Sequence, residues 1–216
     1  MENLKNFEKW WTHNLGNESY IHNNIEHKAP SVKDFETWMG DSFSEDRVSV
    51  RNNFGIFKTI LDAGCGACPE YVGIKNMYKD VKYTGMDITP KLVEYNKSKN
   101  IDCILGSLNN IPFEDNSFDI VHSRHVVEHM SNIEKPLGEM IRVASQRVFI
   151  SFFIKPTEGN EHIINLDNEG TKGEVYHNRY SKILIDKFLN ENKKVKDFRR
   201  TEIPLPSNEL LIINLN

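Results

Sequence analysis

One stretch of ten residues limits the fold more than any other part of the chain. The segment Thr59–Cys68 opens with a short apolar run, reaches an acid at Asp62 and then holds two glycines, Gly64 and Gly66, with one residue between them. Glycine lacks Cβ, so it adopts positive φ angles and lets a ligand approach the backbone closely. Pro69 suits the first position of a following helix, whose free N–H groups can face that ligand. The pattern predicts a buried strand that turns into a helix around a nucleotide-like ligand.

The surroundings of the two glycines indicate what kind of nucleotide this is. A dinucleotide-binding loop has a third small residue where this chain has Pro69, and the next residue, Glu70, would repel a pyrophosphate. A zwitterionic amino-acid moiety suits the position better. The next expected strand, 81–87, ends in Asp87, whose carboxylate can accept hydrogen bonds from both hydroxyls of a ribose. The sequence therefore predicts a ligand that has an amino-acid end and a ribose.

Five motifs, in order over roughly residues 58–155, resemble those of the class I S-adenosylmethionine-dependent methyltransferases, in particular the small-molecule branch with a type 11-like domain. They are Leu61–Gly66, Tyr83–Ile88, Leu105–Ser107, Ile111–Pro112–Phe113 with Ser117–Val121, and Arg124–His129. Two positions depart from the family pattern. Cys68 stands where a third glycine is common, and Ser107 stands where an acid often contacts the adenine, so the adenine contact is expected to be altered.

The resemblance implies S-adenosylmethionine as the cofactor and a set of residues that bind it. The expected cofactor-binding residues are Arg47, Asp62, Gly64, Cys65, Gly66, Asp87, Ile88, Ser107, Leu108 and Arg124. Several keep a second interpretation: Asp62 could only cap the turn, Ile88 could only pack in the core, and Arg47 could be a surface arginine. Arg124 could contact the methionine moiety through its backbone or turn its guanidinium to the acceptor.

Strand-like and helix-like patterns alternate between 58 and 155. Strands are expected near 58–62, 81–87, 101–105, 118–123 and 147–154, and helices near 69–79, 90–99 and 133–145. A further helix, 180–192, precedes two strands, Val195–Ile203 and Glu209–Leu215. Such alternation predicts an α/β fold: a Rossmann-like, doubly wound, seven-stranded sheet, mostly parallel, with a C-terminal antiparallel hairpin and helices on both faces.

The expected organisation has two parts. Residues 1–57 are polar with scattered aromatics and are interpreted as an N-terminal helical cap of short helices and loops, and 58–216 as the cofactor-binding domain. The pair Trp10–Trp11 is interpreted as a packing anchor or a lid. The long polar segment 155–179 is interpreted as a loop on the acceptor side, because long loops in compact domains are usually functional or disordered.

Composition excludes several classes of protein. The net charge is −4 and the pI is near 6.1, which gives no support to a general nucleic-acid binder. No segment approaches the roughly 20 apolar residues that span a bilayer. The N-terminus has no apolar signal core, and the chain holds three cysteines, so a cytoplasmic location is expected. The oligomeric state is left open.

The cysteines and histidines allow other chemistry. Cys65 and Cys68 form a Cys-x-x-Cys pair, but the cofactor loop explains their place better than a redox dithiol, and a zinc site would need a second ligand pair where the chain offers only Cys103. No metal is therefore expected at the site. A metal would require His125, Glu128 and His129 to gather further ligands, with His162 or His177 as candidates.

The string His125-x-x-Glu128-His129 would place three polar side chains on one face of a helix. Three interpretations stay open: residues that shape the acceptor site, a general base, or a metal site. His125, Glu128 and His129 are taken as the candidate catalytic residues because histidine titrates near neutral pH. Three polar residues further on, His177, Arg179 and Tyr180, are candidates for binding the acceptor, although simple solvent exposure explains them equally well.

These observations predict a methyltransferase that transfers the methyl group of S-adenosylmethionine to a small-molecule acceptor, with O-, N- or C-methylation undetermined. Two alternatives remain. One is a cofactor-binding regulatory or scaffold protein without catalysis, suggested by Cys68 and Ser107. The other is an NAD-dependent oxidoreductase, which preferential binding of NADH would reveal.

Overall fold

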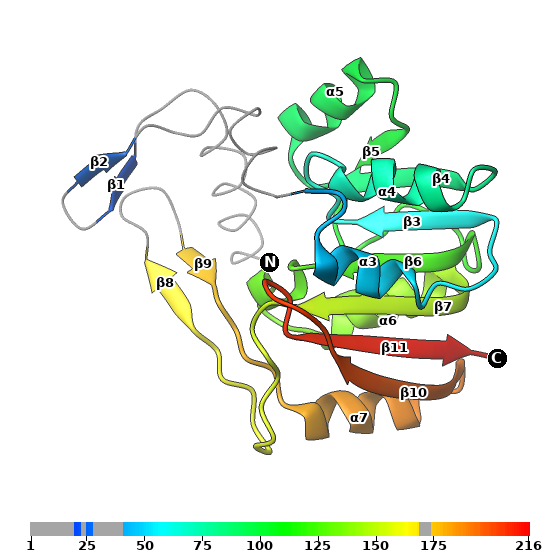
Figure 1. Ribbon diagram of the computed structural model, residues 1–216. Helices are drawn as coiled ribbons and strands as arrows, with labels where there is room; N and C mark the ends of the chain where they lie inside the picture. The colour runs from blue at the N-terminus through cyan, green and yellow to red at the C-terminus, as the bar shows by residue number, and fades with distance from the viewer. Residues whose placement is uncertain (1–19, 23–24, 28–40, 169–173) are drawn as a thin grey trace.

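The computed structural model describes residues 20–22, 25–27, 41–168 and 174–216. A seven-stranded sheet forms its centre, with the strand order β10-β11-β7-β6-β3-β4-β5 (Figure 1). The strands are β3 (Thr59–Ala63), β4 (Lys82–Asp87), β5 (Cys103–Leu105), β6 (Phe118–Arg124), β7 (Ala144–Phe152), β10 (Val195–Glu202) and β11 (Glu209–Leu215). Neighbours from β5 to β7 are parallel, whereas β11 runs antiparallel to both β7 and β10. The predicted α/β class, strand count and C-terminal hairpin are confirmed.

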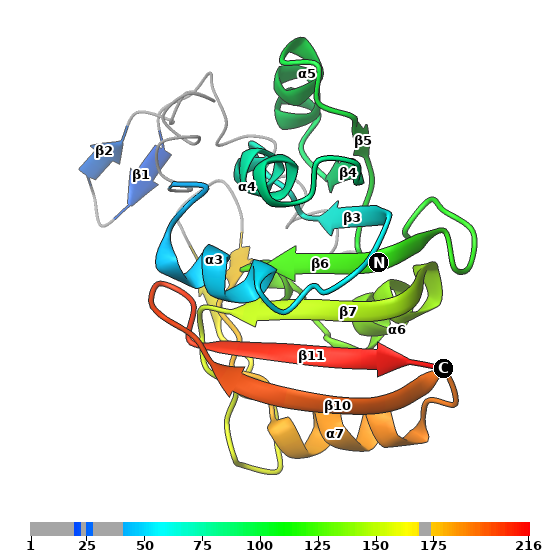
Figure 2. The ribbon, with the colours of Figure 1, turned by 45° about the vertical axis from the view of Figure 1, so that its right-hand side comes forward.

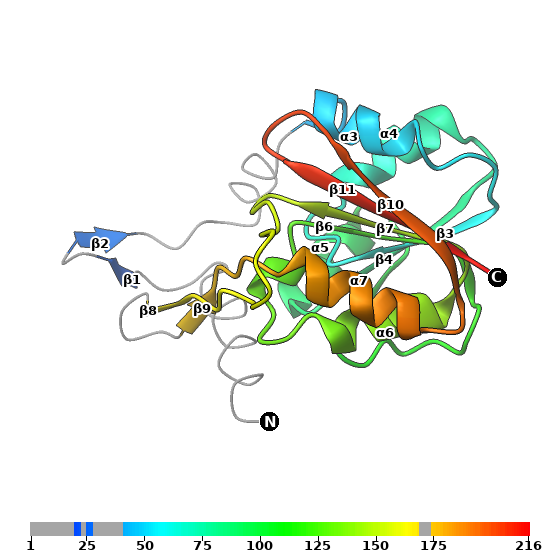
Figure 3. The ribbon, with the colours of Figure 1, turned by 90° about the horizontal axis from the view of Figure 1, so that it is seen from below.

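Helices cover both faces of the sheet (Figure 3). The described helices are α3 (Glu45–Arg51), α4 (Pro69–Met77), α5 (Pro90–Ser98), α6 (Glu134–Val143) and α7 (Lys182–Glu191). One apolar cluster joins the sheet to α6 and α7, and a second joins it to α3, α4 and α5. Because side chains alternate along a strand, Val148 and Ile150 of β7 enter the first cluster and Phe149 enters the second.

The helix starts follow the signals in the sequence. Pro69 and Pro90 are the first residues of α4 and α5, where the missing N–H costs nothing. Asn132 precedes α6, and its Oδ1 accepts the backbone N–H of Lys135 at 3.0 Å. None of the described helices is long and apolar enough to cross a bilayer.

Two short antiparallel hairpins differ from the expectation of helices and loops outside the sheet. One is formed by β1 (Tyr20–His22) and β2 (Ile25–His27), and the other, within the long loop 155–179, by β8 (Leu166–Asn168) and β9 (Glu174–Tyr176). Both lie beyond the carboxyl ends of the parallel strands in Figures 1 and 3. The expected lid residues Trp10 and Trp11 lie outside the described residues, so that prediction stays a prediction.

Helix α3 is the part of the N-terminal region that reaches the sheet. It lies across β6 and β7 close to their carboxyl ends (Figure 2). Val50 of α3 is buried in the same cluster as Phe54, Ile60 of β3 and Phe149 of β7. This packing brings the charged side chains of α3 to the end of the sheet where ligands bind in such folds.

Candidate active site

The two glycines after β3 form a tight elbow. Gly64 has a φ of 80° and Gly66 a φ of 56°, a region that residues with a Cβ rarely adopt. Gly64 also has no room for a side chain, because a Cβ there would lie 2.4 Å from Cγ2 of Val126. The N–H groups of Gly64 and Cys65 donate to the carbonyl of Met86 at 2.7 and 3.0 Å. The elbow is therefore fixed to the end of β4.

Asp87, at the end of β4, points its carboxylate at the elbow. Its Oδ2 accepts the N–H of Gly66 at 2.8 Å and its Oδ1 accepts the N–H of Thr89 at 2.9 Å. Burial raises the pKa of Asp87, against these two hydrogen bonds, which lower it. Since each carboxylate oxygen has two lone pairs, the group keeps capacity for hydroxyl donors.

Three further predicted cofactor residues lie beyond Asp87. Ile88 follows it directly and is half-buried. Ser107 follows β5, the strand next to β4, and its Oγ accepts the N–H of Asn109 at 3.2 Å. The side chain of Leu108 is buried in the cluster beneath α6 and α7, so it is part of the core. The candidates on this side whose side chains are only half-buried are thus Ile88 and Ser107.

A small pocket lies beside the elbow. It is lined by Arg47, Asp62, Gly64, Cys65, Pro69, Glu70 and Arg124. Five of these residues are cofactor candidates from the sequence. The carboxylate of Asp62 accepts the hydroxyl of Tyr83 at 2.7 Å, and Nδ1 of His122 lies 3.3 Å from its other oxygen. Charges of both signs line the pocket, as a zwitterionic group requires.

Two arginines of α3 share one acid of α4. Arg47 Nη1 donates to Oε1 of Glu70, and Arg51 Nη1 donates to its Oε2 at 2.6 Å. All three side chains are buried. The sequence allowed either a cofactor-binding residue or a surface arginine at Arg47; its burial shows that the surface interpretation is wrong, and its partner in the structure is Glu70. The ion pair with Glu70 holds the Arg47 guanidinium at the pocket beside the elbow.

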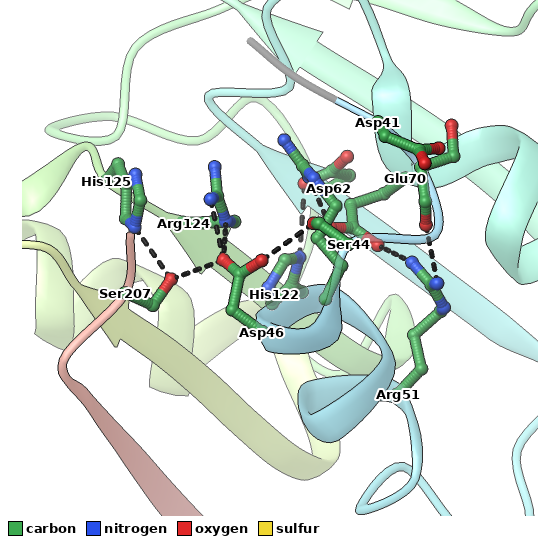
Figure 4. A network of polar contacts seen from close by, with 12 residues as sticks. Asp41, Ser44, Asp46, Arg51, Asp62, Glu70, His122, Arg124, His125 and Ser207 are labelled. Carbon is green, nitrogen blue, oxygen red and sulfur yellow. Dashed lines mark hydrogen bonds and ion pairs between the residues drawn. The ribbon is translucent and has the colours of Figure 1, made fainter. Parts of the chain in front are cut away.

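Asp46 is the centre of a polar network that the sequence did not indicate (Figure 4). Its Oδ2 accepts Arg124 Nη2 at 2.7 Å and the Ser207 hydroxyl at 2.8 Å, and its Oδ1 accepts the Ser44 hydroxyl at 2.7 Å. His125 Nε2 lies 2.7 Å from Ser207 Oγ. Burial of Asp46 favours its neutral form, but the hydrogen bond from Ser44 and the charge of Arg124 lower its pKa to about 2. No local pattern marks Asp46 or Ser207, because their partners are distant in sequence.

The network fixes the tautomer of His125. The single hydroxyl proton of Ser207 goes to Asp46, so His125 must donate from Nε2, and Nδ1 carries the lone pair. Burial, followed by the charge of Arg124, lowers the pKa of His125 to about 2. This imidazole is therefore neutral at physiological pH.

The prediction that His125, Glu128 and His129 lie on one face of a helix is wrong. Val127–His129 form a short 3-10 turn, η1, and His125 before it has a left-handed φ of 57°. Glu128 is fully buried, and its Oε1 accepts the N–H groups of Phe153 at 2.7 Å and Ile154 at 3.3 Å. Within the described residues, these three side chains form no cluster of metal-ligand atoms.

His129 is the second neutral imidazole. Its Nδ1 lies 2.7 Å from the carbonyl oxygen of Tyr176, so Nδ1 carries the proton and Nε2 is the basic atom. Burial, followed by the charge of His177, lowers the pKa of His129 to about 4. The rings of His129 and His177 lie 5.2 Å apart, and the ring of Phe153 lies 5.3 Å from that of His129.

The three candidate acceptor residues separate in the structure. His177 is half-buried beside His129, and the side chain of Arg179 is exposed. Tyr180 is instead buried in the core, with its hydroxyl 2.5 Å from the carbonyl of Met130. Tyr180 therefore supports the η1 turn from inside, which corrects its interpretation as a residue that faces the acceptor.

The three cysteines meet at the base of the elbow. Their Sγ atoms all lie within 4.8 Å of one another, and those of Cys65 and Cys103 are 3.6 Å apart. Hydrogen bonds from the thiols of Cys65 and Cys68 lower the pKa of Cys103, whereas burial raises the pKa of Cys65. From the sequence, Cys103 was interpreted as a single further thiol, because its spacing from Cys65 and Cys68 does not show that β5 brings it to the elbow.

Comparison with known proteins agrees with this geometry. The model of the methyltransferase domain family matches residues 61–152. Ajmaline N-methyltransferase of Rauvolfia serpentina is 29% identical over 96 residues, 41% of this chain and 33% of its own length. An uncharacterized methyltransferase of Bacillus subtilis is 30% identical over 94 residues, 40% of this chain and 36% of its own length. The matched segment thus spans about a third of these relatives.

Solved structures share the fold over most of the chain. A SAM-dependent methyltransferase from Aquifex aeolicus has a TM-score of 0.59 at 22% identity, covering 86% of this chain and 98% of that one. A SAM-dependent methyltransferase from Thermotoga maritima, described as a possible histamine N-methyltransferase, has a TM-score of 0.60 at 14% identity, with coverage of 86% and 96%. Residues 61–152 therefore match the methyltransferase domain family, and the chain shares the fold of these solved SAM-dependent methyltransferases.

Proposed function

We propose that the protein transfers the methyl group of S-adenosylmethionine to a small-molecule acceptor. The observation that carries the proposal is the meeting of the Gly66 N–H and the Asp87 carboxylate at the sheet end, 2.8 Å apart, beside a pocket of mixed charge. Fold and family make S-adenosylmethionine the expected cofactor. The elbow supplies close backbone approach, and Asp87 supplies an acceptor for ribose hydroxyls.

The pocket suits the amino-acid end of the cofactor. The Asp62 carboxylate lines it and would attract the ammonium group. The guanidinium groups of Arg47 and Arg124 also line the pocket and would attract the cofactor carboxylate. In this arrangement Asp87 faces the ribose, and Ile88, Ser107 and the backbone of Leu108 lie on the adenine side.

The acceptor side is bounded by neutral imidazoles. Transfer from a sulfonium is an in-line displacement, for which the protein mainly aligns sulfur, methyl and acceptor. Burial lowers the pKa of His125 to about 2 and that of His129 to about 4, so the expected titration near neutral pH is wrong for both. They would act on an acceptor as neutral hydrogen-bonding groups rather than as strong bases, with His177 beside His129. Glu128 accepts hydrogen bonds from the two residues that follow β7 and so positions the η1 turn that carries His129. Amines are the acceptors to test first, because two of the similar proteins carry N-methyltransferase names.

The cofactor site is tested by calorimetric titration with S-adenosylhomocysteine. Asp87→Ala should weaken binding by about 1.5–3 kcal/mol, or roughly 10- to 150-fold, the scale of hydrogen bonds to a charged group. Asp80→Ala is the matched control, since Asp80 is an exposed acid in the turn before the same strand. A folded Asp87→Ala protein with unchanged affinity would refute the ribose role.

A turnover assay distinguishes a methyltransferase from a cofactor-binding scaffold protein and from an oxidoreductase. With a panel of amines, hydroxyl compounds and carbon acids, methylated product is expected from at least one acceptor class. A protein that binds S-adenosylhomocysteine but leaves S-adenosylmethionine intact with every class would be a scaffold, and one that prefers NADH would be an oxidoreductase. A cytoplasmic location stays a prediction, with which the three reduced cysteines agree.

A further inference from the structure

Three buried thiols converge from two separate segments. Cys65 and Cys68 come from the elbow between β3 and α4, and Cys103 is the first residue of β5. All three side chains are buried, and their Sγ atoms lie within 4.8 Å of one another. Cysteine sulfurs bound to one metal ion have similar mutual distances, since each lies about 2.3 Å from the ion.

The three sulfurs surround one small space on β4. A Cβ atom added to Gly85 would lie 2.9 Å from Sγ of Cys65, 3.0 Å from that of Cys68 and 3.3 Å from that of Cys103. The φ of Gly85 is not in the left-handed region, so the strand backbone does not require glycine there. The missing side chain instead leaves a space that all three sulfurs face.

Cys68 occupies a backbone conformation that favours glycine. Its φ of 55° and ψ of 46° are left-handed, a region that disfavours residues with a Cβ. Glycine would adopt this conformation without that cost. The cysteine therefore places a thiol in the cluster against a conformational penalty.

The number and type of ligand atoms indicate which metal ion the cluster would bind. In the part of the chain that the structure describes, the cluster holds three sulfur donors and no fourth histidine, cysteine or carboxylate ligand. The side-chain amide of Asn96 lies 3.6 Å from Sγ of Cys103 and donates to the carbonyl of Gly66, so it supports a thiolate. Soft thiolates select Cu(I), whereas structural zinc is almost always four-coordinate.

We propose that Cys65, Cys68 and Cys103 form a three-thiolate site for one Cu(I) ion at the base of the glycine elbow. Binding replaces the thiol protons by metal–sulfur bonds and releases them to solvent. Cys65 also lines the pocket beside the elbow, so the proposed site adjoins that pocket. This site does not depend on the proposed methyl transfer.

The test is an anaerobic titration of the reduced full chain with Cu(I), in competition with a chromophoric Cu(I) chelator. One ion per chain is expected, and X-ray absorption should find three sulfur neighbours at about 2.3 Å. Zn(II) is titrated in parallel. A tightly held zinc ion with a nitrogen or oxygen ligand, together with weak Cu(I) binding, would overturn the proposal.

Variants separate the cluster from adventitious binding. Cys68→Gly removes a ligand at a position that suits glycine, and Gly85→Ala fills the shared space. Each should weaken Cu(I) binding by about 100-fold, given that loss of groups that merely support a metal site already costs about 10–100-fold. Gly138→Ala is the control, because a Cβ there would meet only Cζ of Phe188 at 3.7 Å. Circular dichroism checks the fold, and Cys103→Ser replaces any variant that does not fold.

Two results would overturn the site. The first is Cu(I) affinity that is equal in wild type, Cys68→Gly and Cys103→Ser. The second is a disulfide between Cys65 and Cys103 that forms in air and that Cu(I) does not prevent, which would make the cluster a redox pair. Mass spectrometry after alkylation under denaturing conditions counts the free thiols in each case.

Discussion

Glu128 is a buried acid whose charge is only partly compensated. Its Oε1 accepts two backbone N–H groups, and its Oε2 has no hydrogen-bond partner among the described residues. Burial raises the pKa from 4.5 to about 7, although the two backbone bonds lower it. A raised pKa means that the folded chain holds the proton more tightly than the unfolded chain does. Its contribution to stability is therefore complete below about pH 4.5 and is lost as the pH rises towards 7.

Glu128→Gln should remove this pH dependence. Glutamine keeps an oxygen for the N–H of Phe153 and carries no charge, so the variant should gain about 3 kcal/mol relative to wild type between pH 4.5 and pH 8. Urea unfolding at several pH values measures the difference. Glu114→Gln, at an exposed acid in a turn, is the control. If the free energy of unfolding changed with pH in the same way for wild type and Glu128→Gln, the raised pKa of Glu128 would be contradicted.

Helix α3 is held to α4 by ion pairs as well as by apolar packing. Glu70 lies in the first turn of α4 and binds Arg47 and Arg51 of α3. Gly73 makes room for Arg51, since a Cβ there would lie 2.5 Å from its Cζ. The hydroxyl of Tyr78 donates to the carbonyl of Arg51 at 2.8 Å. One carboxylate of α4 thus binds two arginines of α3 at the cofactor pocket.

Glu70→Ala should be strongly destabilising, because it leaves two buried guanidinium groups without their acid. Breaking such a buried pair costs about 3–5 kcal/mol. The loss should appear as a lower urea midpoint with weaker binding of S-adenosylhomocysteine, since Arg47 and Glu70 both line the pocket. Glu94→Ala on α5 removes an exposed acid and serves as the control. A loss as small as that of the control would mean that water compensates the two arginines.

The helices and strands of the α/β fold were predictable because residues next to each one mark where it begins or ends. Pro90 sets the start of α5, and the elbow glycines set the end of β3. The η1 turn was not predictable in the same way. The spacing from His125 to His129 fits a helix, but a left-handed residue at 125 and the bonds from Glu128 to the end of β7 impose a tighter turn. Tertiary contacts therefore override the local pattern there.

At the scale of the molecule, the site consists of two kinds of residues. Asp62, Gly64 and Asp87 stand at strand ends, so sheet topology alone predicts that they meet. Asp46 instead binds Arg124, which lies 78 residues after it, and Ser207, which lies 161 residues after it. The three thiols meet for the same reason. Such contacts depend on how α3, the β10–β11 connection and β5 pack, which no spacing in the sequence encodes.

Because the candidate site joins α3, the elbow and the ends of β4 and β6, ligand binding should stabilise the whole fold. At a concentration of 100 times its Kd, S-adenosylhomocysteine should add about 2.7 kcal/mol. For a chain of this size that raises the Tm by roughly 5–10 °C. Differential scanning fluorimetry measures the shift, with NADH as the control ligand. Asp87→Ala at the same ligand concentration should lose about half of the shift or more, because the ligand is then at only about 0.7 to 10 times its Kd. An equal shift in Asp87→Ala, or a larger one with NADH, would mean that the ligand binds elsewhere than across the elbow and Asp87.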